Sequence, residues 1–273
     1  MIKKKIRYVL KFLLFTLTKI FNLIFKKTNL KILPALEINE QFNFEFSKKT
    51  RRYVFRKNSG RLGKIIFDSS LDETNLCKLG RKFNTNKSGI NLDGHRSGYT
   101  SLYNLLFYHL INKNCSVAEI GIEKNASTKM WREYFKKATI DCFEIDKNKI
   151  NLAIRDKLKN VRYHYIDVSH KKIITSQFKK TKKKYDIIID DSTHLFNHQI
   201  NIILSTYKFL KPGGILVIED IYKFRKGYEE KKYHEKIKHI LKFFSYVTFI
   251  DTSHINNFTA RWKNEKILLL IKK

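Results

Sequence analysis

Cysteine, proline and glycine are all scarce in this chain of 273 residues, which contains 3 Cys, 2 Pro and 10 Gly. Cys77, Cys115 and Cys142 are odd in number and widely spaced, and no CxxC pair occurs. Neither a disulfide framework nor a zinc site built on cysteine pairs is therefore indicated. A reducing cytoplasm is the simplest setting for such a chain.

Acidic residues are also few, at 25 against 56 Lys and Arg, which leaves a formal net charge of +31. A charge of this size first suggests a nucleic-acid partner. However, lysine is spread through nearly every segment, and Ile, Asn and Phe are abundant as well. This pattern is typical of background residue usage rather than of a focused binding stripe, so a dedicated nucleic-acid surface is not favoured.

The first 27 residues contain no acidic residue and differ from the rest of the chain. Residues 6–25 are mostly Leu, Ile and Phe, interrupted by Arg7, Lys11 and Lys19. At the helical period the basic and polar positions gather on one face, which predicts an amphipathic helix lying on an anionic membrane surface. Packing on the protein body or in a dimer, a spanning helix and a cleaved signal peptide are alternatives. Lys11 and Lys19 disfavour the spanning helix.

Residues 28–70 are predicted to form an accessory segment between this helix and the main domain, which we place at residues 71–273. Within the accessory segment, Phe42–Phe46 and Arg52–Arg56 alternate like short strands. The two could pair as a small hairpin beside the main domain.

Helix-length and strand-length segments alternate through residues 71–273. Strands are predicted at 116–120, 139–143, 161–166, 185–190, 215–219, 246–250 and 267–271. Helices are predicted from Ser70 or Asp72 to Lys82 and over 99–111, 127–135, 148–158, 196–210 and 229–243. This alternation predicts an α/β domain with a doubly wound, mostly parallel, seven-stranded sheet.

Paired acids end two of the predicted strands, Asp190-Asp191 in one case and Glu219-Asp220 in the other, and His194 follows closely after the first pair. Because the carboxyl ends of neighbouring parallel strands face one crevice, these side chains should converge. Carboxylates crowded together repel one another unless a cation compensates. The pattern therefore indicates a divalent metal with a histidine base beside it.

Three earlier strand ends carry a different signal. Glu119-Ile120-Gly121 allows a tight turn and the close approach of a ligand to the backbone, and Glu144 and Asp167 end the next two strands. An acid after the second strand can accept hydrogen bonds from ribose hydroxyls. Since the first loop is acidic and the chain has no GxGxxG, these residues favour a cationic nucleoside such as S-adenosylmethionine over a pyrophosphate cofactor.

Several motifs are shared with a known family. They are Phe83–Lys87, Gly98–Tyr103, Glu119–Ile122, Lys129–Trp131, Asp190–His194, His198–Gln199 and Ile218–Asp220. With them the chain resembles the class I S-adenosylmethionine-dependent methyltransferases, in the branch of the metal-dependent macrolide-sugar and cephalosporin-biosynthesis enzymes. It departs from that family at Asn125 and Ala126, where glycines are usual.

The resemblance implies a role for each matching residue. Asp191, Glu219 and Asp220 would bind Mg²⁺, and His194 would be the general base that deprotonates an acceptor hydroxyl. Asp190 would orient the loop or the cofactor amine. The residues implied to contact S-adenosylmethionine are Glu119, Gly121, Ser127, Glu144, Asp167, Thr85 and Lys87, the last two closing over the pocket.

The leading hypothesis is a Mg²⁺-assisted O-methyltransferase that acts on a sugar or another polyhydroxylated metabolite. The N-terminal helix suggests a cytoplasmic protein held at the inner membrane face, with a membrane-associated glycan precursor as acceptor. The alternatives are an RNA methyltransferase and a non-catalytic membrane-surface protein with the same fold. No Asn-Pro-Pro-Tyr-like loop follows the fourth strand, which argues against amino methylation of RNA. The oligomeric state stays open.

Overall fold

The computed structural model describes Leu17 and residues 63–71, 73–91, 95–259 and 262–273. The chain divides into two compact units, residues 1–54 and 55–273. The accessory hairpin predicted in residues 28–70 lies outside the described residues, as does the N-terminal helix except for Leu17, which is helical and exposed. Among the described helices, none has the length and hydrophobicity that crossing a bilayer requires.

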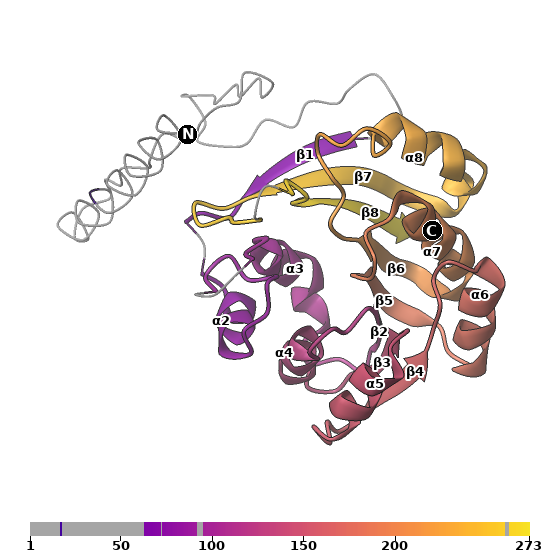
Figure 1. The fold of residues 1–273 in the computed structure, drawn as a ribbon, viewed down its shortest axis with the longest axis horizontal. Helices are drawn as coiled ribbons and strands as arrows, with labels where there is room; N and C mark the ends of the chain where they lie inside the picture. The colour runs from indigo at the N-terminus through magenta and orange to yellow at the C-terminus, as the bar shows by residue number, and fades with distance from the viewer. Residues whose placement is uncertain (1–16, 18–62, 72, 92–94, 260–261) are drawn as a thin grey trace. The chain divides into compact units, whose positions relative to one another are not determined.

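Eight strands form one sheet, in the order β1-β7-β8-β6-β5-β2-β3-β4 (Figure 1). The strands are β1 (Gly63–Asp68), β2 (Ser116–Ile120), β3 (Thr139–Glu144), β4 (Val161–Tyr165), β5 (Tyr185–Asp190), β6 (Leu210–Ile218), β7 (Phe244–Ser253) and β8 (Lys266–Lys272). Only β8 runs antiparallel to its neighbours, β6 and β7. The predicted doubly wound, mostly parallel sheet is therefore confirmed. An eighth strand, β1, pairs with β7 and begins before the domain boundary predicted at residue 71.

Helices cover both faces of the sheet (Figure 1). One face carries α2 (Asn75–Lys82), α3 (Tyr99–Phe107), α4 (Ala126–Tyr134) and α5 (Lys147–Ile154), and the other carries α6 (Lys171–Lys180), α7 (Phe196–Thr206) and α8 (Glu230–Ile237). On β5, Ile187 and Ile189 pack into the hydrophobic core under α2–α5, whereas Ile188 packs into the core under α6–α8. A strand buried on both faces favours apolar side chains at successive positions, which is why β5 contains the unbroken run Ile187–Ile189.

Two local predictions differ from the structure. Helix α2 is capped by Thr74, whose Oγ1 accepts from the Cys77 amide at 3.2 Å, and not by Ser70, whose hydroxyl donates to Asp68 Oδ1 at 2.5 Å. Asp72, the other predicted cap, lies outside the described residues. Helix α6 has no counterpart among the predicted helices. Its segment is rich in lysine, and only Ile174 and Phe178, four residues apart, are buried from it. Two apolar positions in a basic segment are a weak helical signal.

A buried carboxylate anchors the β3–β4 edge of the sheet. The Asp141 side chain is fully buried and accepts from Arg162 Nε at 2.9 Å, Lys183 Nζ at 3.0 Å and the Tyr185 hydroxyl at 3.1 Å, while His164 Nε2 lies 2.9 Å from Oδ1. Burial opposes the charged form, but the hydrogen bonds from His164, Arg162 and Lys183 outweigh it and hold the pKa of Asp141 well below its usual range. Because the folded-state pKa is depressed, the stabilisation is present above the unfolded pKa of about 4 and is lost as the pH falls below it.

Replacing Asp141 by Asn should therefore lower the free energy of unfolding by about 3 kcal/mol at pH 7, because the cations around it lose their counter-charge. The difference from the unmodified protein should shrink below about pH 4. Urea unfolding followed by circular dichroism measures both effects. Glu133→Gln, which breaks the exposed Lys82–Glu133 pair, is the control and should cost less than about 1 kcal/mol. An equal loss in the two variants would contradict the role of Asp141.

Candidate active site

The carboxyl ends of four strands lie side by side. In the sheet register, Ile218 of β6 pairs with Asp190 of β5, Asp190 with Ile120 of β2, and Ile120 with Phe143 of β3. The loops that follow these strands therefore start at one edge of the sheet. This edge is where ligands bind in open α/β sheets.

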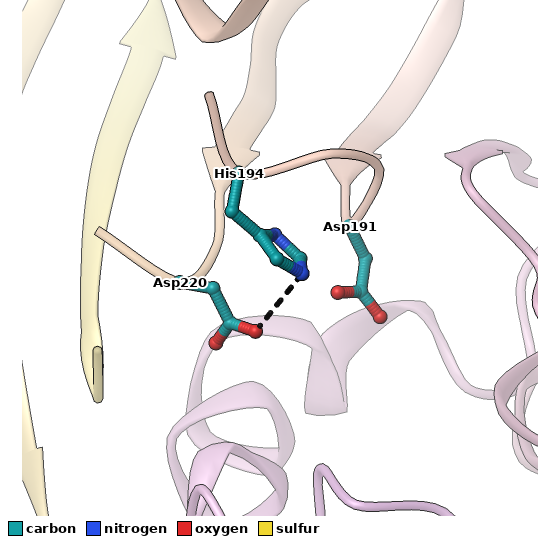
Figure 2. Close-up of side chains that lie close together, drawn as sticks. All are labelled: Asp191, His194 and Asp220. Carbon is teal, nitrogen blue, oxygen red and sulfur yellow. Dashed lines mark ion pairs between the residues drawn. The ribbon is translucent and has the colours of Figure 1, made fainter. Parts of the chain in front are cut away.

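Asp191, His194 and Asp220 come together at this edge (Figure 2). One ligand atom from each lies within 4.8 Å of the others. Asp191 and His194 belong to the β5–α7 loop, and Asp220 follows β6. His194 Nε2 is 3.5 Å from Asp220 Oδ2. Among the predicted catalytic and metal-binding residues, these three form the cluster whose ligand atoms could hold an ion together.

The backbone is held in an uncommon conformation at two members of this cluster. His194 has a φ of 57° and Asp220 a φ of 56°, both in the left-handed region. Residues other than glycine visit this region rarely, because Cβ crowds the backbone there. Such positions concentrate at functional sites, where the surrounding structure imposes them.

Glu219 lies next to the cluster, with both carboxylate oxygens already accepting hydrogen bonds. The Tyr103 hydroxyl donates to Oε1 at 2.6 Å, and Lys87 Nζ donates to Oε2 at 2.5 Å. Lys87 Nζ also lies 2.5 Å from Asp191 Oδ2. Burial raises the pKa of Glu219 well above its usual value, in spite of the Lys87 charge. Burial alone would lower the pKa of Lys87, but the attraction of Asp191 and Glu219 outweighs it and raises that pKa.

Asp220 is buried as well. Its Oδ1 accepts from the Tyr99 hydroxyl at 2.6 Å. Burial, with the negative charge of Asp191, raises the pKa of Asp220, although His194 acts in the opposite direction. Carboxylates whose pKa is raised by burial and by one another lack positive charge, which a bound cation would supply. The carboxylate oxygens therefore fit a hard divalent ion, and His194 lies beside them as a candidate base.

Asp190 is buried and oriented by its own loop. Oδ1 accepts from the Ser192 amide at 3.1 Å and from the Ser192 hydroxyl at 2.6 Å. Burial raises the pKa of Asp190 to about 6, and the hydrogen bonds from Ser192 reduce that shift. The side chain thus shapes the β5–α7 loop that carries Asp191 and His194, in keeping with the loop-orienting alternative.

Glu119 and Gly121, predicted to contact the cofactor, lie at the end of β2 and on the turn that follows it. The Glu119 carboxylate is fully buried and accepts from Thr128 Oγ1 at 2.8 Å and from Trp131 Nε1 at 2.9 Å. Burial raises the pKa of Glu119. The charge of Lys87 and a hydrogen bond from Ser127 are among the interactions that lower it. Glu119 thereby ties β2 to the start of α4, where Ser127 lies.

Glu144 and Asp167 lie at the ends of β3 and β4 as predicted. Glu144 Oε2 accepts from the Ile122 amide at 3.2 Å, and Oε1 accepts from the Ile145 amide at 2.8 Å, so the carboxylate connects the β2 and β3 loops. Asp167 Oδ1 accepts from the Ser169 amide and hydroxyl, and these bonds lower its pKa.

Thr85 is buried beside Lys87 and accepts from the Lys87 amide at 3.4 Å. The structure thus places Lys87 against Asp191 and Glu219, with Thr85 beside Lys87. Their contact with a cofactor stays a prediction, as do the cofactor roles of Glu119, Gly121, Ser127, Glu144 and Asp167.

Tyr99 and Tyr103 are site residues to which sequence reasoning gave no role at the metal centre. They lie four residues apart on α3, so they share one face of the helix and reach Asp220 and Glu219 together. That spacing was the available signal. Gln199 was also given no role, yet its Nε2 donates to the Glu219 carbonyl at 2.9 Å and supports the backbone there.

No family model matches this chain. Among curated proteins, 131 residues, or 45% of this chain, are 28% identical to a Streptomyces olivaceus protein, 8-demethyl-8-(2-methoxy-alpha-L-rhamnosyl)-tetracenomycin-C 3'-O-methyltransferase. Another 158-residue match, covering 55% of this chain, is 23% identical to 8-demethyl-8-alpha-L-rhamnosyl tetracenomycin-C 2'-O-methyltransferase of the same organism. The matches span 32% and 38% of these relatives' own lengths.

Among solved structures, MycE, a methyltransferase from the mycinamycin biosynthetic pathway, was determined in complex with Mg, SAH and mycinamycin VI. It matches with a TM-score of 0.56 and 18% identity, over 73% of this chain and 55% of MycE. This chain has the class I methyltransferase fold. The resemblance seen in the sequence is therefore confirmed. The acidic cluster lies at the carboxyl edge of the sheet.

Gly121 is the point where two loops of the methyltransferase fold touch. Its φ is +87°, and a Cβ there would overlap the Asp191 carbonyl oxygen and lie 2.7 Å from the carbonyl carbon. Gly121→Ala should therefore destabilise the protein by more than about 2 kcal/mol, because the β5–α7 loop would have to move. Gly213 is a matched control, because its φ is +72° but an added methyl group would meet only open space. Gly213→Ala should cost only about 1 kcal/mol; urea unfolding of both variants measures the difference, and equal costs would contradict the contact.

Proposed function

We propose that this protein is an S-adenosylmethionine-dependent, Mg²⁺-assisted O-methyltransferase that acts on a hydroxyl of a sugar or a polyhydroxylated metabolite. The observation that carries the proposal is the cluster of Asp191, His194 and Asp220 at the carboxyl edge of a methyltransferase sheet. The names of the two tetracenomycin relatives, both of which methylate rhamnosyl groups, support a sugar acceptor.

The cofactor would lie along the ends of β2, β3 and β4. Gly121 leaves room at the first strand end, while Glu144 and Asp167 present carboxylates at the next two that suit ribose hydroxyls and adenine. The buried acids at this edge favour a cationic sulfonium over an anionic pyrophosphate. Thr85, Glu119 and Ser127 would shape the walls of this pocket.

A divalent cation would be held by Asp191, Asp220 and Glu219, and when bound it would lower the pKa of an acceptor hydroxyl. His194 then receives the proton of that hydroxyl, most directly at Nε2, which faces the cluster. Asp220 lies 3.5 Å from this nitrogen and stabilises the protonated ring. Tyr99 and Tyr103 hold Asp220 and Glu219 in place by donating hydrogen bonds to them. Orientation of the hydroxyl oxygen in line with the methyl group completes the contribution of the protein.

His194→Gln should lower kcat by about 10²- to 10⁴-fold, because the variant lacks the base, whereas the affinity for S-adenosylhomocysteine should stay within about threefold. Turnover is measured with rhamnosylated acceptors and labelled S-adenosylmethionine, and affinity by calorimetry. His198→Gln is the matched control: His198 lies in the same segment and hydrogen-bonds to the exposed Thr193 hydroxyl, and the variant should keep its activity.

Three results would refute the proposed function. The first is a His194→Gln variant that turns over sugar acceptors as fast as the unmodified protein. The second is methylation of RNA without any requirement for Mg²⁺, which would favour the RNA methyltransferase alternative. Failure to bind S-adenosylmethionine at all would exclude both enzymes and favour the non-catalytic protein.

We further propose that residues 1–27 hold the enzyme at an anionic membrane surface, which would favour a membrane-associated glycan precursor as acceptor. Support comes from the sequence alone, through the basic face of the predicted helix. The full-length protein should float with vesicles that contain phosphatidylglycerol but not with neutral ones. Replacing Lys11 and Lys19 together by Glu should abolish flotation, since each lysine near an anionic surface contributes about 1 kcal/mol. Equal flotation on neutral vesicles would contradict an electrostatic anchor.

A further inference from the structure

Lys87 is a buried lysine beside the candidate metal site. Its side chain is 1% exposed, and its ammonium group lies 2.5 Å from both Asp191 Oδ2 and Glu219 Oε2. These carboxylates follow two different strands, 104 and 132 residues further along the chain. The ammonium group therefore bridges the two loops that would hold a metal.

Hydrogen bonds hold the main chain at Lys87 through its carbonyl and its amide. The Thr100 amide donates to the Lys87 carbonyl at 3.2 Å, and the Ser97 amide donates to the neighbouring Asn86 carbonyl at 2.8 Å. Thr85 Oγ1 accepts from the Lys87 amide. Since the main chain is held at this point, the ammonium group is attached at a set position and cannot diffuse away as a free ion would.

Charge counting gives Lys87 a specific role. Asp191, Glu219 and Asp220 carry three negative charges when all are ionised, and Lys87 cancels one of them. The remainder is balanced by one divalent cation. Without Lys87 the same carboxylates would attract the ion more strongly and would have charge left for a second.

We propose that Lys87 is a tethered cation that takes the place of a second metal ion. It occupies one oxygen each of Asp191 and Glu219. A single, weakly held divalent ion is left with Asp220, the other oxygen of Asp191 and the remaining lone pair of Glu219 Oε1, which also accepts from Tyr103. This inference rests on the metal site of the proposed function. It differs from a purely structural ion pair, because a structural pair would leave metal affinity and stoichiometry unchanged.

The test is a titration of the full-length protein with Mn²⁺, in which electron paramagnetic resonance counts the free ion. Lys87→Met should lower the Kd for Mn²⁺ by at least about tenfold, or add a second bound ion, because a positive charge is removed beside the site. Lys87→Met combined with Glu219→Gln removes one charge of each sign and one proposed ligand, so its Kd should lie above that of Lys87→Met alone. Lys82→Met, which breaks an exposed ion pair with Glu133, should leave the Kd unchanged.

Lys87→Met alone leaves Asp191 and Glu219 without their cationic partner and could fail to fold. The same comparison can then be made in the Glu219→Gln background, where the double variant should bind Mn²⁺ at least about tenfold more tightly than Glu219→Gln alone. A Kd that is unchanged or higher on loss of Lys87 would overturn the inference while leaving the metal site in place. No Mn²⁺ binding by the unmodified protein would overturn the metal site itself, and the role of Lys87 with it.

Discussion

Negative charge buried at one edge of the sheet is the constraint on which the rest of the site depends. Asp191 lies partly buried beside Glu219 and Asp220, which are almost wholly buried, and burial raises the pKa of the last two. A low-dielectric interior tolerates such a cluster only with nearby cations and hydrogen-bond donors. Lys87 and the two tyrosines of α3 supply part of this compensation. The part they leave unsupplied is the physical reason to expect a divalent ion.

The parallel sheet makes this concentration of charge possible. Neighbouring parallel strands end at the same edge, so residues that follow β5 and β6 meet although a whole helix separates them in sequence. The same arrangement brings Gly121 against the Asp191 carbonyl, so that the loop after β2 and the loop after β5 cannot move independently. The candidate cofactor side and the candidate metal side of the edge are thus mechanically connected.

Much of this could be predicted from local pattern. The apolar runs of β2, β3 and β5 end in Glu119–Gly121, Glu144 and Asp190-Asp191, and their boundaries agree with the structure to within a residue or two. Elements with weaker patterns were less predictable. Helix α6 buries only two side chains, and α2 starts at the capping residue Thr74 rather than at Ser70. In both cases the deciding contacts are made by a few side chains, which leave little periodicity to detect.

By itself, the sequence determined the alternation of helices and strands and the acids that end the strands, because both depend on residues close together in the chain. Only the tertiary structure decided which charges meet. In the sequence, Lys87 is one of many lysines in a basic chain, yet the fold buries it between Asp191 and Glu219. The fold also turns Tyr99 toward Asp220 and Tyr103 toward Glu219. These partners are separated by more than a hundred residues, so no local propensity encodes them. They meet because α3 packs in the same core as β2, β5 and β6, and the loop before α3 carries Lys87.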